Sequence, residues 1–349
     1  MWTRRDILRL APVTALLGAA HGANGPDFGR VDTHVHIHRD APALLSSLED
    51  SRWRGLDIVV CPAVGDEPFD LEEKLRATHK VARESGGTLA WASTFDARAF
   101  ESPSFTDRTI ARLSRSFDDG AIGVKIWKNI GMAIKSKSGA YLLPDDPTLL
   151  PIYEAIGRAD RTLVAHLAEP DGAWLALDDK NPEIGYYSKN PHWHMFGKLG
   201  APVKHAILAA RDRVLARYPK LRVVGCHLGS DEDDLKRLAR RLDAYPNFAV
   251  DTAARVRYFA RVDRDQARQF LARYQDRILY ATDFSLRDGD PAAAAKSLQA
   301  THERDWEFFS RGDVMEYAGH QTRGLELPQD VLHKIFRENA LRWLPGFRA

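Results

Sequence analysis

Two histidines separated by one residue give the clearest chemical signal in this chain. They belong to the run Val31-Asp32-Thr33-His34-Val35-His36, in which polar and apolar residues alternate. On a β-strand this alternation places Asp32, His34 and His36 on one face. The backbones of His34 and His36 would then stand roughly 6–7 Å apart, so both imidazoles could bind one metal ion. Taken alone, the pair is equally compatible with a strand whose polar face carries two histidines by accident.

Other residues suited to metal chemistry follow other predicted strands. They are Lys125 after a fourth strand, His166 after a fifth, His227 after a sixth and Asp283 after an eighth. Two positions before Lys125, His227 and Asp283 the chain has the small residues Gly123, Gly225 and Ala281. Small inward residues leave room beneath a ligand in the mouth of a barrel, whereas the opposite phase, which includes Cys226, would face the helices. Together the strand ends favour a metal cage over unrelated histidines.

The elements that would position these residues alternate between strands and helices. Apolar runs predict eight strands at about residues 31–36, 56–64, 88–95, 121–127, 162–168, 221–228, 248–252 and 277–283. Amphipathic stretches predict helices at about residues 42–52, 71–84, 107–117, 148–159, 203–217, 233–244, 263–274 and 328–344. This order predicts an α/β fold, a (β/α)8 TIM-like barrel with long insertions after strands 4, 5 and 8. A doubly wound sheet would require a glycine-rich turn where this chain has its histidines.

The composition is that of an ordinary globular enzyme. The 349 residues are 44% hydrophobic and 28% charged, and their formal net charge is +2. No block of like charge indicates a nucleic-acid partner, and a homo-oligomer is compatible with the sequence. The two cysteines, Cys61 and Cys226, lie in apolar runs without metal-binding spacing, so we expect buried free thiols.

The first residues have the pattern of an export signal. Thr3-Arg4-Arg5-Asp6-Ile7-Leu8-Arg9 contains paired arginines, and an apolar stretch at 10–20 and small residues follow it. An apolar run of this length indicates a signal peptide rather than a membrane span. The paired arginines indicate the bacterial twin-arginine (Tat) route to the periplasm. We therefore expect a signal peptide at residues 1–24 and a single domain at residues 25–349, with an N-terminal helix of the mature fold as the alternative.

The strand-end motifs together resemble the amidohydrolase superfamily, specifically the metal-dependent branch that includes aminocarboxymuconate-semialdehyde decarboxylase. The motifs are Asp32-Thr33-His34-Val35-His36, Gly123-Val124-Lys125-Ile126-Trp127, Ala165-His166, Cys226-His227-Leu228-Gly229, Ala281-Thr282-Asp283-Phe284 and Glu338-Asn339-Ala340. The resemblance runs from about Val31 to the C-terminal helix. It implies that a divalent metal ion, most often zinc, is held by His34, His36, His166 and Asp283. It also implies that His227 is either a ligand of a second ion or a catalytic side chain that polarises the substrate.

Lys125 has three interpretations. In two-metal members of the superfamily a lysine after strand 4 is carboxylated and bridges the ions, whereas in single-metal members the equivalent residue is not a ligand. Lys125 could alternatively be an ammonium group that binds a substrate carboxylate, or the base of a buried salt bridge. Whether the site holds one or two ions therefore depends on Lys125 and His227.

The resemblance implies hydrolysis of an amide, ester or lactone bond in a small molecule. A divalent ion makes nucleophilic water available at neutral pH, and Asp283 would act as general base and then general acid. The alternative is non-oxidative decarboxylation of an aromatic or unsaturated carboxylic acid, because this branch contains both reactions. A minor alternative is a metal-binding barrel without catalytic activity.

Substrate contacts are expected from the same rim of the barrel. Lys125 and Arg255 would supply positive charge, and Trp127 and His194 would supply ring surface, His194 from an aromatic-rich insertion at residues 169–202. Asp251 and Arg255 are pocket candidates, although a surface salt bridge would explain them nearly as well. An anionic or aromatic small molecule suits these groups.

Overall fold

Parallel strands form the central sheet of the protein in the computed structural model, which describes residues 28–62, 69–286 and 289–347. The strands are β1 (Arg30–His36), β2 (Trp53–Ile58), β3 (Leu89–Thr94), β4 (Gly123–Ile126), β5 (Thr162–Ala165), β6 (Val223–Gly225), β7 (Phe248–Asp251), β8 (Ile278–Leu279) and β9 (Phe284–Ser285). They pair in chain order from β1 to β8, and β9 pairs with the other edge of β1. Because only residues 280–283 separate β8 from β9, these two form one interrupted eighth strand. Thr33 N donates to Tyr280 O (3.0 Å) across the seam, so the sheet curls into a TIM-like barrel.

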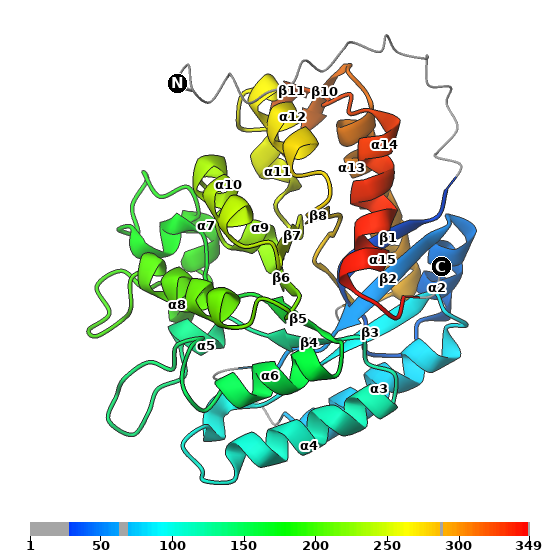
Figure 1. Ribbon diagram of the computed structural model, residues 1–349. Coiled ribbons are helices and arrows are strands. Elements are labelled where there is room, and N and C mark those ends of the chain that lie inside the picture. The colour runs from blue at the N-terminus through cyan, green and yellow to red at the C-terminus, as the bar shows by residue number, and fades with distance from the viewer. Residues whose placement is uncertain (1–27, 63–68, 287–288, 348–349) are drawn as a thin grey trace.

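Helices cover the outside of this sheet (Figure 1). The longer ones are α2 (Pro42–Asp50), α3 (Leu71–Glu84), α4 (Phe105–Asp118), α6 (Leu150–Arg158), α8 (Lys204–Arg217), α10 (Leu235–Ala244), α12 (Arg264–Arg273) and α13 (Pro291–Ser310). The chain closes with α14 (Gln329–His333), a π-helical turn (Lys334–Glu338) and α15 (Asn339–Trp343). Long segments follow β4, β5 and the eighth strand, and this architecture confirms the predicted barrel class.

The segment after the eighth strand is more regular than the sequence patterns indicated. It contains α13 and an antiparallel hairpin of β10 (Val314–Tyr317) and β11 (His320–Arg323), neither of which was predicted. The predicted signal at residues 1–24 lies outside the described residues. Among the residues that are described, none belongs to a helix long and apolar enough to cross a membrane.

Apolar side chains pack on both faces of the sheet. Neighbouring residues of a strand alternate between two clusters: Leu163 packs with the surrounding helices, whereas Val164 joins Val31 and Leu279 in the interior of the barrel. Trp343 and Phe347 from the C-terminal end pack onto the same interior cluster. The N-terminal ends of the strands are therefore closed by apolar packing, and the carboxyl ends carry the polar residues.

A β-bulge in β1 changes which of its side chains face the interior. The pairing with β2 shifts between Asp32 and Val35, so Thr33 and His34 together lie opposite one residue of β2. The extra residue reverses the alternation. The prediction that Asp32 shares a face with His34 and His36 is therefore wrong, because both histidines approach Asp283 at the barrel mouth whereas Asp32 contacts His302 of α13 on the outside.

Asp32 joins the first strand to the eighth strand and to α13. Its carboxylate is completely buried and accepts hydrogen bonds from the backbone N of His34 and of Thr282 (3.1 Å each). It also accepts from Thr282 Oγ1 (2.7 Å) and from His302 Nε2 (2.9 Å). The His302 ring in turn stacks on Trp53, with 3.8 Å between the ring centroids. Asp32 therefore holds the barrel seam beneath the metal-binding histidines.

Replacing Asp32 with alanine should reduce the free energy of unfolding by about 3 kcal/mol. The change leaves several buried donors without an acceptor, and each such group costs about 1–3 kcal/mol before any relaxation. Urea denaturation followed by circular dichroism measures the loss. The control is Asp40→Ala, an exposed aspartate shortly after the same strand, which should change stability by less than about 0.5 kcal/mol. Equal stability of the two variants would contradict the role of Asp32.

Candidate metal centre

Three side chains from the first and eighth strands converge at the carboxyl end of the barrel. Asp283 Oδ1 lies 3.4 Å from Nε2 of His34 and 3.4 Å from Nε2 of His36. The potential ligand atoms of all three residues lie within 4.8 Å of one another. Two imidazole nitrogens and one carboxylate oxygen form a donor set that suits zinc and other divalent transition metals.

Hydrogen bonds orient both histidines so that Nε2 faces this cluster. His36 Nδ1 lies 2.7 Å from the carbonyl oxygen of Ile58, which can only accept, so Nδ1 carries the proton. His34 Nδ1 lies 3.0 Å from Asp251 Oδ2, and a carboxylate likewise accepts. A ring that carries one proton therefore holds it on Nδ1 and presents an unprotonated Nε2 to Asp283.

A left-handed backbone conformation turns Asp283 into the mouth. Its φ is 66°, which interrupts the eighth strand between β8 and β9, and its backbone N donates to His34 O (2.9 Å). Burial alone would raise the pKa of this carboxyl. Contact with the imidazoles of His36 and His34 and the positive charge of Lys125 outweigh burial and hold the pKa below its usual value. Asp283 is therefore an anion at neutral pH, and its side chain is still 33% exposed.

His166 and His227 complete the wall of the site. Their ring centroids lie 4.1 Å apart, and the His227 ring lies 5.2 Å from that of His34. The strand β6 ends at Gly225, earlier than predicted, and His227 occupies a left-handed turn (φ 58°) after it. His227 Nδ1 donates to Ala253 O (2.8 Å), so its Nε2 is also left as an acceptor. Burial lowers the pKa of both histidines well below the usual value, helped by Lys128 near His166.

The arrangement fits a divalent metal ion. His166 Nε2 is buried and has no hydrogen-bond partner, which is costly for a polar atom unless a ligand satisfies it. The neutral form of His34, favoured by its burial and by the nearby Lys125, is the form that binds metals. The residues suited to hold the ion are His34, His36, Asp283 and His166, with His227 adjacent.

Lys125 points into the barrel directly below this site. It is 1% exposed, and its Nζ lies 3.3 Å from His34 Nε2 and donates to Cys226 Sγ (2.8 Å). The prediction that Cys226 faces the helices is therefore wrong, although both cysteines are buried and free as expected. Cys226 also forms a second group of potential ligands with Asp251 and Nδ1 of His34, into which the Lys125 ammonium donates. The structure thus places Lys125 against His34 and Cys226.

Buried ion pairs line the site next to the metal-binding residues. Lys128, just after β4, bonds to Glu169, and its Nζ lies 4.4 Å from the ring centroid of Trp193. Arg255 donates to Glu232 Oε1 (3.2 Å) with both side chains almost fully buried, so the suggested surface salt bridge is wrong. The sequence did not indicate that Lys128 pairs with Glu169 or Arg255 with Glu232, because ion pairs between separate loops leave no local signal.

Two residues were predicted to offer ring surface to the substrate. His194 lies in the segment after β5, and Trp127 lies beside that segment. Trp127 is half-buried, and its ring centroid lies 5.0 Å from that of Trp193 in that segment. His194 donates from Nε2 to the carbonyl oxygen of Leu175 (2.8 Å), and its ring lies 5.7 Å from that of Tyr187. Trp127 is therefore close to the Lys128 ion pair, whereas His194 contacts Leu175 and Tyr187 of its own segment.

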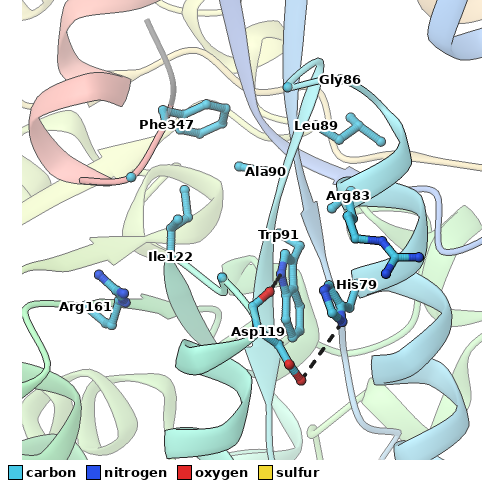
Figure 2. A pocket seen from close by; sticks show the side chains of 14 residues that line it. His79, Arg83, Gly86, Leu89, Ala90, Trp91, Asp119, Ile122, Arg161 and Phe347 are labelled. Atoms are coloured by element: carbon cyan, nitrogen blue, oxygen red, sulfur yellow. Dashed lines mark hydrogen bonds and ion pairs between the residues drawn. The ribbon is translucent and has the colours of Figure 1, made fainter.

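A cavity of about 520 Å³ lies at the opposite end of the barrel, between the start of β3, the start of β4 and the C-terminal segment (Figure 2). In it the His79 ring is stacked on Trp91, with ring centroids 5.8 Å apart, and His79 Nδ1 lies 4.0 Å from Asp119 Oδ2. Within the described part of the chain, both groups of potential metal ligands lie instead at the carboxyl end. Barrel enzymes carry their chemistry at that end.

Comparison with known proteins agrees with the fold. A family model described as amidohydrolase matches residues 31–346, so this chain belongs to the amidohydrolase family. It is a metal-dependent enzyme of that superfamily. A comparison with curated protein sequences gave no match.

Solved structures of two decarboxylases share the fold at low sequence identity. The 2,6-dihydroxybenzoate decarboxylase from Rhizobium is 15% identical, with a TM-score of 0.53 over 91% of this chain and 98% of that one. The dihydroxybenzoic acid decarboxylase from Polaromonas sp. JS666, with bound manganese and 2-nitroresorcinol, is 14% identical, with a TM-score of 0.54 over 92% and 98% of the two chains.

Proposed function

We propose that this protein is a hydrolase that cleaves an amide, ester or lactone bond of a small molecule with the help of a divalent metal ion. One observation carries the proposal. Asp283 approaches two unprotonated histidine nitrogens at 3.4 Å while a third of its side chain stays exposed. It can therefore contribute to a metal site and reach a water molecule at the same time. We propose zinc as the ion.

The residues of the chain have distinct tasks in this reaction. A divalent ion held here would supply a Lewis acid and activate water. Asp283, an anion because of its lowered pKa, accepts a proton from the attacking water and then donates it to the leaving group. His227 presents Nε2 to the space beside His34, where it accepts a hydrogen bond from the substrate or from water. Lys128 and Arg255, each in a buried ion pair, lie along the adjoining wall.

Decarboxylation of an aromatic carboxylic acid is the second candidate. It is favoured by the buried cations Lys128 and Arg255, whose charges help to lower the pKa of His166 and so lie near the site. A carboxylate substrate would accept hydrogen bonds from these cations in place of part of their bonds to Glu169 and Glu232, and Trp127 and Trp193 offer ring surface next to Lys128. Two structural neighbours are decarboxylases of dihydroxybenzoate, which supports testing such acids here.

A substrate panel separates the two reactions. The purified protein, loaded with zinc or manganese, is incubated with amides, esters, lactones and hydroxybenzoates, and products are followed by mass spectrometry and CO₂ release. Hydrolysis products without CO₂ support the first proposal. CO₂ release from hydroxybenzoates, with no hydrolysis of the other compounds, would replace it with the second.

We further propose that residues 1–24 direct export by the Tat route to the periplasm. The support is the pair Arg4-Arg5 ahead of an apolar stretch. A fusion of this segment to a fluorescent protein should reach the periplasm of a bacterium with a Tat system. Replacing both arginines with lysine should abolish that export while keeping the charge, and unchanged export would contradict the Tat assignment.

A further inference from the structure

We propose that Asp251 is a positioning residue, which keeps His34 in the tautomer that can bind the metal ion. The inference rests on the proposed metal-dependent function. Asp251 lies at the end of β7 and is not a member of the cluster formed by His34, His36 and Asp283.

The Asp251 carboxylate is fully occupied by donors from three places. It is 0% exposed, so it cannot contact substrate. Its Oδ1 accepts from the backbone N of His227 (2.7 Å) and of Ala253 (3.1 Å). Its Oδ2 accepts from His34 Nδ1 (3.0 Å). The two oxygens thus have separate tasks, one toward the backbone and one toward the imidazole.

The bond to Oδ2 decides where the single proton of the His34 ring lies. On the other side of the ring Lys125 Nζ, a donor, lies 3.3 Å from Nε2, which fits an Nε2 that carries no proton. A neutral imidazole carries one N–H, and a carboxylate can only accept. The proton therefore lies on Nδ1, and Nε2, which faces Asp283, keeps its lone pair.

Asp251 also links His34 to the turn that carries His227. Strands β6 and β7 are neighbours, so the end of β7 lies beside the left-handed turn at His227. Because Asp251 Oδ1 binds the backbone N of His227, one carboxylate fixes both a ring of the first strand and the turn after the sixth. Cys226 Sγ receives a hydrogen bond from Lys125. It lies within 4.8 Å of a carboxylate oxygen of Asp251 and of a ring nitrogen of His34.

Asp251→Asn tests the tautomer directly because the orientation of the new amide is determined in advance. Two backbone N–H groups at the Oδ1 position require the amide oxygen there. The amide NH₂ must then face His34 Nδ1 and donate to it. The His34 proton should move to Nε2, where it blocks binding of a metal.

Two measurements follow this change. In the metal-free protein, ¹⁵N NMR of histidine, with His34→Gln to assign the signal, should show Nδ1–H in the wild type and Nε2–H in Asp251→Asn. In chelator competition, the affinity for Zn²⁺ should fall about 10- to 100-fold. An unchanged tautomer or an unchanged affinity in a folded Asp251→Asn protein would overturn the inference.

The matched control is Asp57→Asn. Asp57 is also completely buried, accepts from the backbone N of Ile37 and of His38 (2.9 Å each) and pairs with His38 Nδ1 (3.0 Å). His38 is outside the metal cluster, so this variant should keep the His34 tautomer and Zn²⁺ affinity within about twofold of the wild type.

The outcomes distinguish this inference from the proposed function. A wild-type protein that binds no divalent metal refutes the proposed function, yet the tautomer of His34 is still measured in the same metal-free sample. If Asp251→Asn does not fold, the wild-type spectrum decides: Nδ1–H supports the inference and Nε2–H overturns it.

Discussion

Asp283→Asn should reduce turnover at least about 1,000-fold, which corresponds to about 4 kcal/mol of transition-state stabilisation. Asparagine keeps the size of the side chain but can neither accept a proton from water nor carry the negative charge next to His34 and His36. The fold should survive, because Asp283 has a φ of 66° and asparagine tolerates this left-handed conformation better than most residues. The measurement is kcat on the substrate that the panel identifies.

A matched aspartate controls for the loss of charge. Asp290 caps α13, where its carboxylate accepts from the backbone N of Ala292 (2.9 Å) and of Ala293 (3.3 Å). Asparagine caps helices about as well as aspartate, so Asp290→Asn should retain both stability and kcat. Undiminished turnover of Asp283→Asn, with the same circular dichroism spectrum as the wild type, would refute its role as the proton carrier.

The barrel and the approximate position of the site could be predicted from the sequence. Alternating strands and helices determine a parallel sheet, and the carboxyl ends of parallel strands meet at one rim. Asp283 is distant in sequence from His34 and His36, yet all three lie at the ends of predicted strands, and this placement brings them to the same rim. The same reasoning correctly places Lys125 in the interior, because β4 is regular and its alternation with Val124 and Ile126 holds.

Alternation failed where a strand is irregular or has already ended. The bulge in β1 adds one residue between Asp32 and Val35, and no residue type in that run announces it. The strand β6 stops at Gly225, so counting by twos cannot place Cys226 or His227 beyond it. Both irregularities serve the site, since one turns His34 inward and the other lets His227 take its left-handed turn.

The sequence also did not indicate which polar side chains pair with each other across separate elements. His302 of α13 is buried and donates to Asp32 at a separation of 270 residues, a contact that no sequence pattern indicates. Asp251 was considered a substrate contact because it follows a strand, yet its donors make it inaccessible. Burial and pairing of a charged residue depend on the tertiary arrangement, and no periodicity encodes that.

Removal of metal should abolish turnover and its return should restore it. Several ligand-type atoms converge at the site, and His166 Nε2 is buried without a partner, so the chain alone leaves a polar atom unsatisfied that an ion would satisfy. Dialysis against a chelator should therefore reduce kcat to background, and stoichiometric Zn²⁺ or Mn²⁺ should recover most of it. The metal-free protein should also melt at a lower temperature, because an ion present at 1,000 times its Kd stabilises the folded state by about 4 kcal/mol.

The variants His166→Ala and His194→Ala sharpen this experiment. His166 packs against His227 in the wall of the site and its buried Nε2 has no partner, so its loss should lower the metal content found by elemental analysis and remove most of the thermal shift on adding Zn²⁺. His194 bonds to Leu175 O within the segment after β5, so its loss should leave metal content and thermal shift unchanged. The contrast excludes a general effect of removing an imidazole. Full turnover in protein shown to be free of metal would end the proposal of metal-dependent chemistry, whatever the two variants do.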